Sequence, residues 1–224
     1  MPCGYVAKRA SEITGVEILC NSGTRQMTKH GKAVNAVGLG ESLELLITWI
    51  ESIGDKPKVL IAHNGKNFDM QILLRNVRKC GLEDDFCKAV AGFSDSYILL
   101  RTERKDIKQY KLTSLYSEFV QETYCAHSAA EDALALLKVY RAARIDRKAT
   151  LKYSIKVEDA FMYTNDVAEN RNSVRNLQRQ LIYDGKNVIS NNIAKKICSS
   201  GLNYKALEVA FQRNNTDGLK LFIK

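Results

Sequence analysis

The chain is poor in proline, in paired cysteines and in long apolar runs, and each shortage excludes a class of protein. Two prolines among 224 residues and no low-complexity tract argue against long disordered linkers. Six cysteines lie far apart without a Cys-x-x-Cys pair, so zinc ligation is not expected. The sequence shows no signal peptide, and its longest apolar runs are far short of a transmembrane span. We therefore expect a nuclear or cytoplasmic protein, in a reducing compartment, that binds no membrane.

The overall composition is that of a globular protein with a basic bias. Hydrophobic residues make up 45% of the chain and charged residues 26%, and the formal net charge is +9. Residues 146–224 carry 14 Lys or Arg against eight Asp or Glu, a balance of +6. A basic balance favours polyanionic partners, but dispersed lysines also serve simply as a solvated surface. Charge alone leaves both interpretations open.

One stretch, residues 59–74, combines strand, turn and helix signals. The apolar run 59–62 predicts a strand buried on both faces, and the tripeptide 63–65 supplies a turn. Helical spacing begins after Asn67 and is carried by Phe68, Ile72, Leu73 and Val77. Asn67 is a candidate N-cap, which puts Asp69 in the first helical turn, beyond the carboxyl end of a strand, where open α/β sheets bind ligands. Asp69 is therefore either a ligand-binding carboxylate or only a complement to the helix dipole.

A second stretch, residues 125–137, opens another helix. Ser128 and Glu131 have the spacing of a capping box, so His127 lies just outside the helix and Asp132 about one turn inside. An imidazole beside an inward carboxylate suits a general base next to a metal ligand. In the alternative, His127 packs at the helix entry and Asp132 is solvated.

Together, the two stretches resemble the DEDDh family of 3′–5′ exonucleases, whose fold is ribonuclease H-like. The three-prime repair exonucleases and the exonuclease-like C-terminal domain of the promyelocytic leukaemia protein are the most similar members. Residues 62–69, Ala-His-Asn-Gly-x-x-Phe-Asp, resemble the second family motif, and His127-x4-Asp132 resembles the third. Residues 93–96 are similar to the next strand and residues 110–116 to the helix after it. The resemblance covers residues 1–145.

The sequence departs from the family at its first motif, an Asp-x-Glu on the opening strand that supplies two of four metal-binding carboxylates. No Asp-x-Glu followed by a turn occurs before residue 59, and residues 10–16 resemble the segment after the third strand of the family. The resemblance therefore implies an α/β, ribonuclease H-like exonuclease fold that lacks its first strands. Because the central strands would be missing, we also expect self-association.

The resemblance implies roles for particular residues. Asp69 and Asp132 match metal ligands for Mg²⁺ or Mn²⁺, and His127 matches the general base. Asp95 is expected to support the site from the neighbouring strand, His63 to shape the turn, and Phe68 to lie in the core. Two carboxylates can hold one ion but are a poor basis for a two-ion site.

The pattern also predicts the organisation of the chain. We expect an exonuclease-like domain at 1–145 and a basic helical module at 146–224. Helices are expected at 43–53, 67–80, 112–120, 129–142, 157–167, 174–183 and from Ser190 on, strands at 59–62 and within 89–100, and a polar loop at 21–32. A basic connection is a candidate phosphate contact or a solvated charge run: Arg101, Arg104, Lys105, Lys108 and Lys111.

Two functional hypotheses remain open. In one, the chain is part of a 3′–5′ exonuclease that trims the 3′ ends of single-stranded DNA or RNA. In the other, it is an exonuclease-like scaffold without catalysis that binds nucleic acid or proteins.

Overall fold

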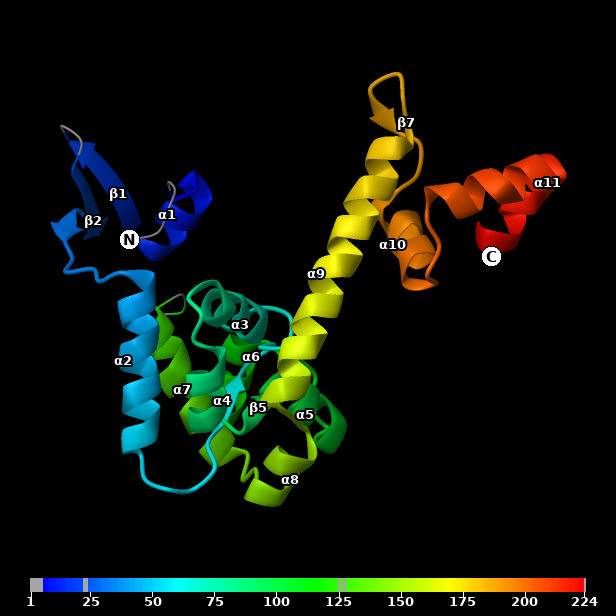
Figure 1. Ribbon diagram of the computed structural model, residues 1–224. Helices are drawn as coiled ribbons and strands as arrows, with labels where there is room; N and C mark the ends of the chain where they lie inside the picture. The colour runs from blue at the N-terminus through cyan, green and yellow to red at the C-terminus, as the bar shows by residue number, and fades with distance from the viewer. Residues whose placement is uncertain (1–5, 22–23, 125, 127, 224) are drawn as a thin grey trace. The chain divides into compact units, whose positions relative to one another are not determined.

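The computed structural model describes residues 6–21, 24–124, 126 and 128–223, and the chain divides into two compact units, Met1–Ala160 and Phe161–Lys224 (Figure 1). Within the described ranges, no helix is both long enough and apolar enough to cross a bilayer. Helices and small sheets build the first unit, so the α/β class predicted from the sequence is confirmed.

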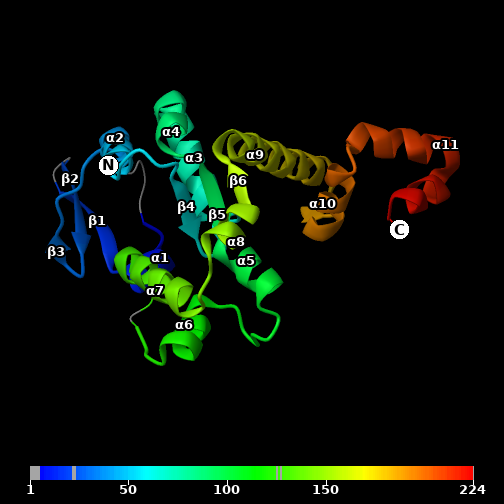
Figure 2. The same ribbon diagram turned by 90° about the horizontal axis from the view of Figure 1, so that it is seen from below.

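A three-stranded sheet forms the middle of the first unit. Strand β4 (Val59–Ala62) pairs in parallel with β5 (Gly92–Asp95), and β5 pairs antiparallel with β6 (Ser154–Lys156), as Figure 2 shows. A Cβ atom at position 92 would collide with the carbonyl oxygen of Ile155, which explains why β5 begins with glycine. In this register Ala62 lies opposite Asp95, so both strands end at the same edge of the sheet.

Strand β4 confirms the predicted strand, but not its predicted burial on both faces. The order β4-β5-β6 puts β4 at the edge, and in the described residues no strand pairs with its other side. Three of its residues are half-buried and Ile61 is 37% exposed. An apolar run therefore marked an edge strand here, not a central one.

Most predicted helices of the first unit are observed. They are α2 (Leu39–Ser52), α3 (Asp69–Lys79), α6 (Leu112–Val120) and α7 (Ala129–Ala142). Three shorter helices lie between or after them: α4 (Glu83–Ala89), α5 (Ser96–Glu103) and α8 (Arg147–Lys152). Helices α5, α6 and α7 share one buried cluster that includes Leu100, Leu115 and Val139. On the sheet, Phe86 of α4 stacks on Phe93 of β5 at 6.2 Å between ring centroids.

The N-terminal part of the first unit differs from its prediction. After α1 (Lys8–Thr14), an antiparallel hairpin of β1 (Val16–Asn21) and β2 (Thr24–Lys29) extends into the short β3 (Lys32–Ala33). The prediction of a polar loop at 21–32 was therefore wrong. Polar residues dominate β2, so the alternation of apolar and polar side chains that marks a strand is weak there.

Most of the longest described helix belongs to the second unit. Helix α9 (Val157–Gln180) runs without a break through the two helices predicted at 157–167 and 174–183. A hairpin of β7 (Ile182–Tyr183) and β8 (Lys186–Asn187) then leads to α10 (Asn191–Ser199), the helix predicted from Ser190 on, and the Ser190 hydroxyl accepts a hydrogen bond from the Ile193 N–H. Helix α11 (Tyr204–Ile223) is kinked at Asn214 and Asn215.

The first unit continues past residue 145 to Ala160. It does so because β6 pairs with β5, and because Val157 and Ala160 are fully buried. The assignment of separate functions to 1–145 and 146–224 stays a prediction.

Candidate functional site

A buried carboxylate organises the turn between β4 and α3. Asp95 is only 7% exposed, and its Oδ1 accepts hydrogen bonds from the backbone N–H groups of Asn64 and Tyr97, both at 2.9 Å. Its Oδ2 accepts from the backbone N–H of Lys66 at 3.0 Å. A carboxylate that accepts three backbone bonds holds the turn in one conformation. Asp95 therefore fixes the backbone of the turn and, through the Tyr97 N–H, the start of α5.

The residues of the turn fit its backbone geometry. Asn64 has a φ of 58°, a conformation that Asn tolerates better than most residues. A Cβ atom at Gly65 would lie 2.6 Å from that of Ala62, so no larger residue fits there without a shift. The carbonyl oxygen of Gly65 then accepts from the N–H of Met70 at 2.9 Å. The turn thus fixes where α3 begins.

The His63 side chain forms hydrogen bonds through both of its ring nitrogens. Its Nε2 lies 2.8 Å from the carbonyl oxygen of Tyr110, and its Nδ1 lies 2.9 Å from the Ser96 hydroxyl. A carbonyl only accepts, so Nε2 carries the proton and Nδ1 accepts from Ser96. Burial lowers the pKa of His63, with opposing contributions from the Tyr110 bond and the charge of Asp95. The imidazole stays neutral and links the turn to the segment before α6, as expected for a residue that shapes the turn.

Asp69 is the first residue of α3, and its side chain is exposed. The N-cap is Phe68 and not Asn67, whose side-chain amide instead donates to the Asn64 side chain at 2.7 Å. Phe68 is 59% exposed, so its predicted place in the core was wrong. The buried side chains of α3 are those of Met70, Gln71, Leu74 and Val77, so Phe68 and Asp69 lie outside the packed face of the helix.

Asp132 lies in the first turn of α7, as predicted, and is half-buried. Ser128 is the N-cap residue, but in the described residues its side chain accepts no capping bond. The pKa of Tyr124 is raised to about 12, mainly because the phenol is partly buried. A hydrogen bond to Asp132 and the negative charge of that carboxylate raise it further. The Tyr124 phenol therefore remains protonated and donates to Asp132. His127, the predicted general base, lies outside the described residues.

The structure brings Asp69 and Asp132 to one open pocket of about 660 Å³. Strand β4, the start of α6 and the start of α7 supply its other walls: Ile61, Ala62, His63, Leu112, Thr113, Tyr124, Ala126, Ala129, Ala133 and Leu136. Asp69 also faces a second cavity of about 450 Å³ over the sheet, together with Leu60, Phe93 and Ile155. The two predicted ligand carboxylates, 63 residues apart in the sequence, thus line the same cavity.

The pocket offers two carboxylates, Asp69 and Asp132, as ligands for a divalent ion. Magnesium and manganese prefer several oxygen ligands, and two-ion hydrolases hold their pair with more carboxylates than two. In the described part of the chain, no group of three or more His, Cys, Asp or Glu side chains is placed to hold a metal. The described residues therefore do not complete a two-ion site.

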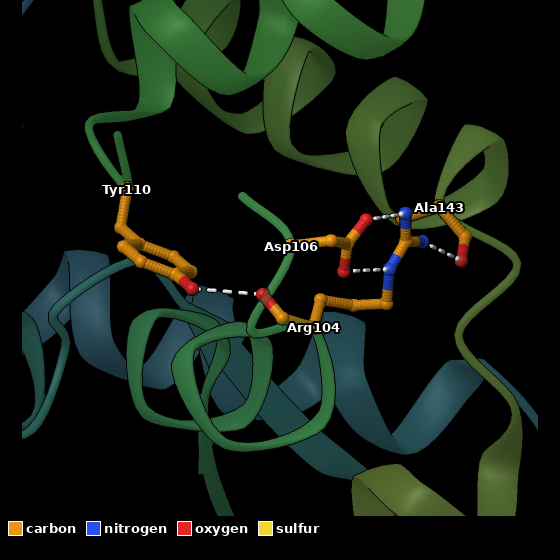
Figure 3. Close-up of polar contacts among 4 residues, drawn as sticks. All are labelled: Arg104, Asp106, Tyr110 and Ala143. Atoms are coloured by element: carbon orange, nitrogen blue, oxygen red, sulfur yellow. Dashed lines mark hydrogen bonds and ion pairs between the residues drawn. The ribbon is translucent and has the colours of Figure 1, made fainter. Parts of the chain in front are cut away.

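The basic connection after α5 is not a uniform charge run. Arg104 binds both carboxylate oxygens of Asp106, at 3.1 and 2.9 Å, and donates to the Ala143 carbonyl at 3.5 Å, while Tyr110 donates to the Arg104 carbonyl at 2.7 Å (Figure 3). Its guanidinium also lies 5.1 Å from the Phe119 ring. Arg104 therefore joins its loop to α6 and α7 and is not a free phosphate contact. The other four cations are exposed: Arg101, Lys105, Lys108 and Lys111.

Two residues of the site, Ser96 and Tyr124, were not predicted from the sequence. Ser96 hydrogen-bonds His63, and Tyr124 bonds to Asp132. Ser96 follows Asp95 in a segment that resembles the family, but no pattern predicts its pairing with a turn 33 residues earlier. The position of Tyr124 just before the third motif is a weak indication that it belongs to the site.

Comparison with known proteins identifies the family of this chain. A family model described as exonuclease matches residues 27–140, which is half of the chain and includes both motifs. A second model, the C-terminal domain of the promyelocytic leukaemia protein, matches residues 185–224. The chain is 31% identical over 120 residues to the Arabidopsis thaliana protein named exonuclease DPD1, chloroplastic/mitochondrial. That match covers 50% of this chain and 37% of the relative, so the chain spans little more than a third of the relative's length.

Proposed function

This chain belongs to the exonuclease family, and from that premise we propose that it engages the 3′ ends of single-stranded DNA or RNA at the pocket of Asp69 and Asp132, with weak hydrolysis of its own. Nucleic acid is the substrate class of the family, and divalent metals are its usual cofactors. The choice of the 3′ end, the Mg²⁺ or Mn²⁺ ion and the weak activity are parts of the proposal.

One observation carries it. Asp69 and Asp132 come from different motifs and different helices, and both line one pocket at the end of β4. Two surface carboxylates without a shared role are not expected to line one pocket beyond the end of a strand, which is where α/β proteins bind ligands. The surrounding residues fix both positions: Asp95 and Gly65 set the start of α3, and Tyr124 donates to Asp132.

Weak hydrolysis follows from the number of carboxylates. A bound divalent ion would stabilise charge on the phosphate and activate water, and Asp69 and Asp132 are the residues that would hold it. The sequence contains no Asp-x-Glu motif to supply further ligands. Loss of a single electrostatic element at an active site typically lowers the rate by on the order of 10²–10³.

A non-catalytic scaffold is the second candidate. The incomplete donor set of the described residues favours it. In that case, the pocket binds nucleic acid without cleaving it. For both candidates we propose a nuclear or cytoplasmic location and self-association through the open edge of β4.

The test is release of nucleotides from a 3′-labelled single strand in Mg²⁺ and in Mn²⁺. The full chain is compared with Asp69→Asn and Asp132→Asn, and with Asp55→Asn, which removes an exposed carboxylate outside the pocket. We expect slow, metal-dependent release by the parent chain and by Asp55→Asn, and none by the two pocket variants.

Each other outcome is informative. Equal release by all four proteins would mean that the pocket is not the site of hydrolysis, and the proposal would fail. No release by the parent chain, with binding of the strand retained, would favour the scaffold. Rapid trimming that depends on Asp132 would show that the metal has more ligands in this chain than Asp69 and Asp132, and that hydrolysis is not weak.

A further inference from the structure

The second unit contains a basic groove between α9 and α10. Its volume is about 670 Å³, and we define it by its four cations, Arg171 and Arg175 on α9 and Lys195 and Lys196 on α10. We infer that this groove binds the phosphate backbone of a nucleic acid. The inference rests on the proposed function, which supplies the polyanion, and it adds a second binding site for that polyanion outside the exonuclease-like pocket.

The cations are arranged on facing walls. Arg171 and Arg175 are one helical turn apart, roughly 6 Å along α9. The buried contacts of Val174, Leu177, Ala194 and Ile197 hold α9 and α10 together beneath them. This packing places one pair of cations on each of the two helices that line the groove, so a phosphate chain lying in it can contact both pairs.

The four cations are available to a ligand. All four side chains are exposed, and in the part of the chain that the structure describes none of them makes an ion pair. Asp166 is the one carboxylate among the described residues that line the groove. Their charges are therefore largely uncompensated within this groove.

The remaining lining indicates which part of a nucleic acid is contacted. Amides and a hydroxyl line the groove beside the cations: Asn170, Gln178, Asn191 and Ser199. Phosphate oxygens accept hydrogen bonds from such groups as well as from Arg and Lys. No aromatic side chain is among the described lining residues, so stacking of bases, the usual second element of single-strand sites, is missing. Contacts to phosphate alone predict binding that is strongly salt-dependent and indifferent to sequence.

The experiment measures the affinity of the full chain for a fluorescent single strand in EDTA, at several salt concentrations, by fluorescence anisotropy. The groove variant carries Arg171→Gln and Arg175→Gln, and a second groove variant carries Lys195→Gln and Lys196→Gln. Glutamine is a good helix former, so both helices should persist. Arg179→Gln with Lys186→Gln is the control, because it removes the same charge from exposed residues of the same unit outside the groove.

We expect each groove variant to bind roughly tenfold more weakly near ~0.15 M salt, with the slope of log K against log salt reduced in magnitude by about 1.4. Those values follow from about 0.7 counterions released per phosphate contact on a single strand. The control should keep the parent slope. Two strands of unrelated sequence should give the same result.

Equal losses in the groove and control variants would overturn the inference, because binding would then follow net charge and not the groove. Unchanged affinity in both groove variants would also overturn it. The assay contains no free divalent metal and measures no cleavage, so failure of the proposed hydrolysis leaves its result intact. Conversely, Asp69→Asn and Asp132→Asn should leave unchanged the part of the slope of log K against log salt that the four groove cations contribute.

Discussion

Replacement of Asp95 by Asn changes one oxygen of a carboxylate on which three backbone N–H groups converge. The amide oxygen can still accept from Asn64 and Tyr97, as Oδ1 does in the native turn. The new NH₂ group then faces the Lys66 N–H, where Oδ2 accepted a bond at 3.0 Å. Two donors meet in a site that is almost fully buried.

The cost can be worked from these contacts. A hydrogen bond to a charged group contributes about 1.5–3 kcal/mol, and a buried donor without its acceptor costs about 1–3 kcal/mol. We therefore expect Asp95→Asn to lower the free energy of unfolding of the first unit by about 2–3 kcal/mol. Asp95→Ala removes all three bonds and should cost on the order of 4–6 kcal/mol.

Urea unfolding, followed by amide hydrogen exchange, measures the effect in the unit concerned. The N–H groups of Asn64, Lys66 and Tyr97 should lose protection first, because each donates to Asp95. Asp55→Asn, at an exposed position, should change neither the urea midpoint nor the exchange. A loss below about 0.5 kcal/mol in Asp95→Asn would refute the account of Asp95 as the organiser of the turn, since ordinary surface substitutions fall in that range.

Two further predictions concern the first unit. Because burial lowers the pKa of His63 below its unfolded value of 6.5, stability should be level above that pH and fall as the pH is lowered through the folded pKa. Urea midpoints between pH 7.5 and pH 5 test this, and a flat profile would contradict it. The second prediction is self-association, because β4 has an open edge and Trp49 of α2 and Leu134 of α7 are 60% and 53% exposed. Light scattering after size exclusion should give a mass above that of one chain, and a monomer at all concentrations would exclude it.

The elements that carry the motifs could be predicted from local patterns. The apolar run of β4 and the helical spacing of α6 and α7 are contained in short windows of sequence, and all three elements occur where they were expected. The pairing of Asp69 with Asp132 in one pocket followed from the resemblance to the exonuclease family, since nothing in the spacing of two distant residues requires it.

The remaining features depend on tertiary contacts that no local pattern contains. Asp95 could be placed at the end of its strand, but its three bonds to a turn and a helix start are visible only in the fold. Phe68 belongs to the apolar spacing of its helix, yet α3 packs through Met70 and Leu74, and Phe68 is exposed. Likewise, Arg104 reads as one more cation in a basic loop, and its bond to the Ala143 carbonyl joins segments 39 residues apart.

The proposal that the pocket of Asp69 and Asp132 receives a 3′ end can be tested directly by photocrosslinking. A single strand with a photoreactive nucleotide at its 3′ terminus is bound to the full chain, irradiated and mapped by mass spectrometry. The account predicts crosslinks to the lining of that pocket, within residues 61–69 and 124–136, which are lost when the reactive nucleotide is moved to the 5′ terminus. Crosslinks from both termini confined to residues 161–224 would contradict it.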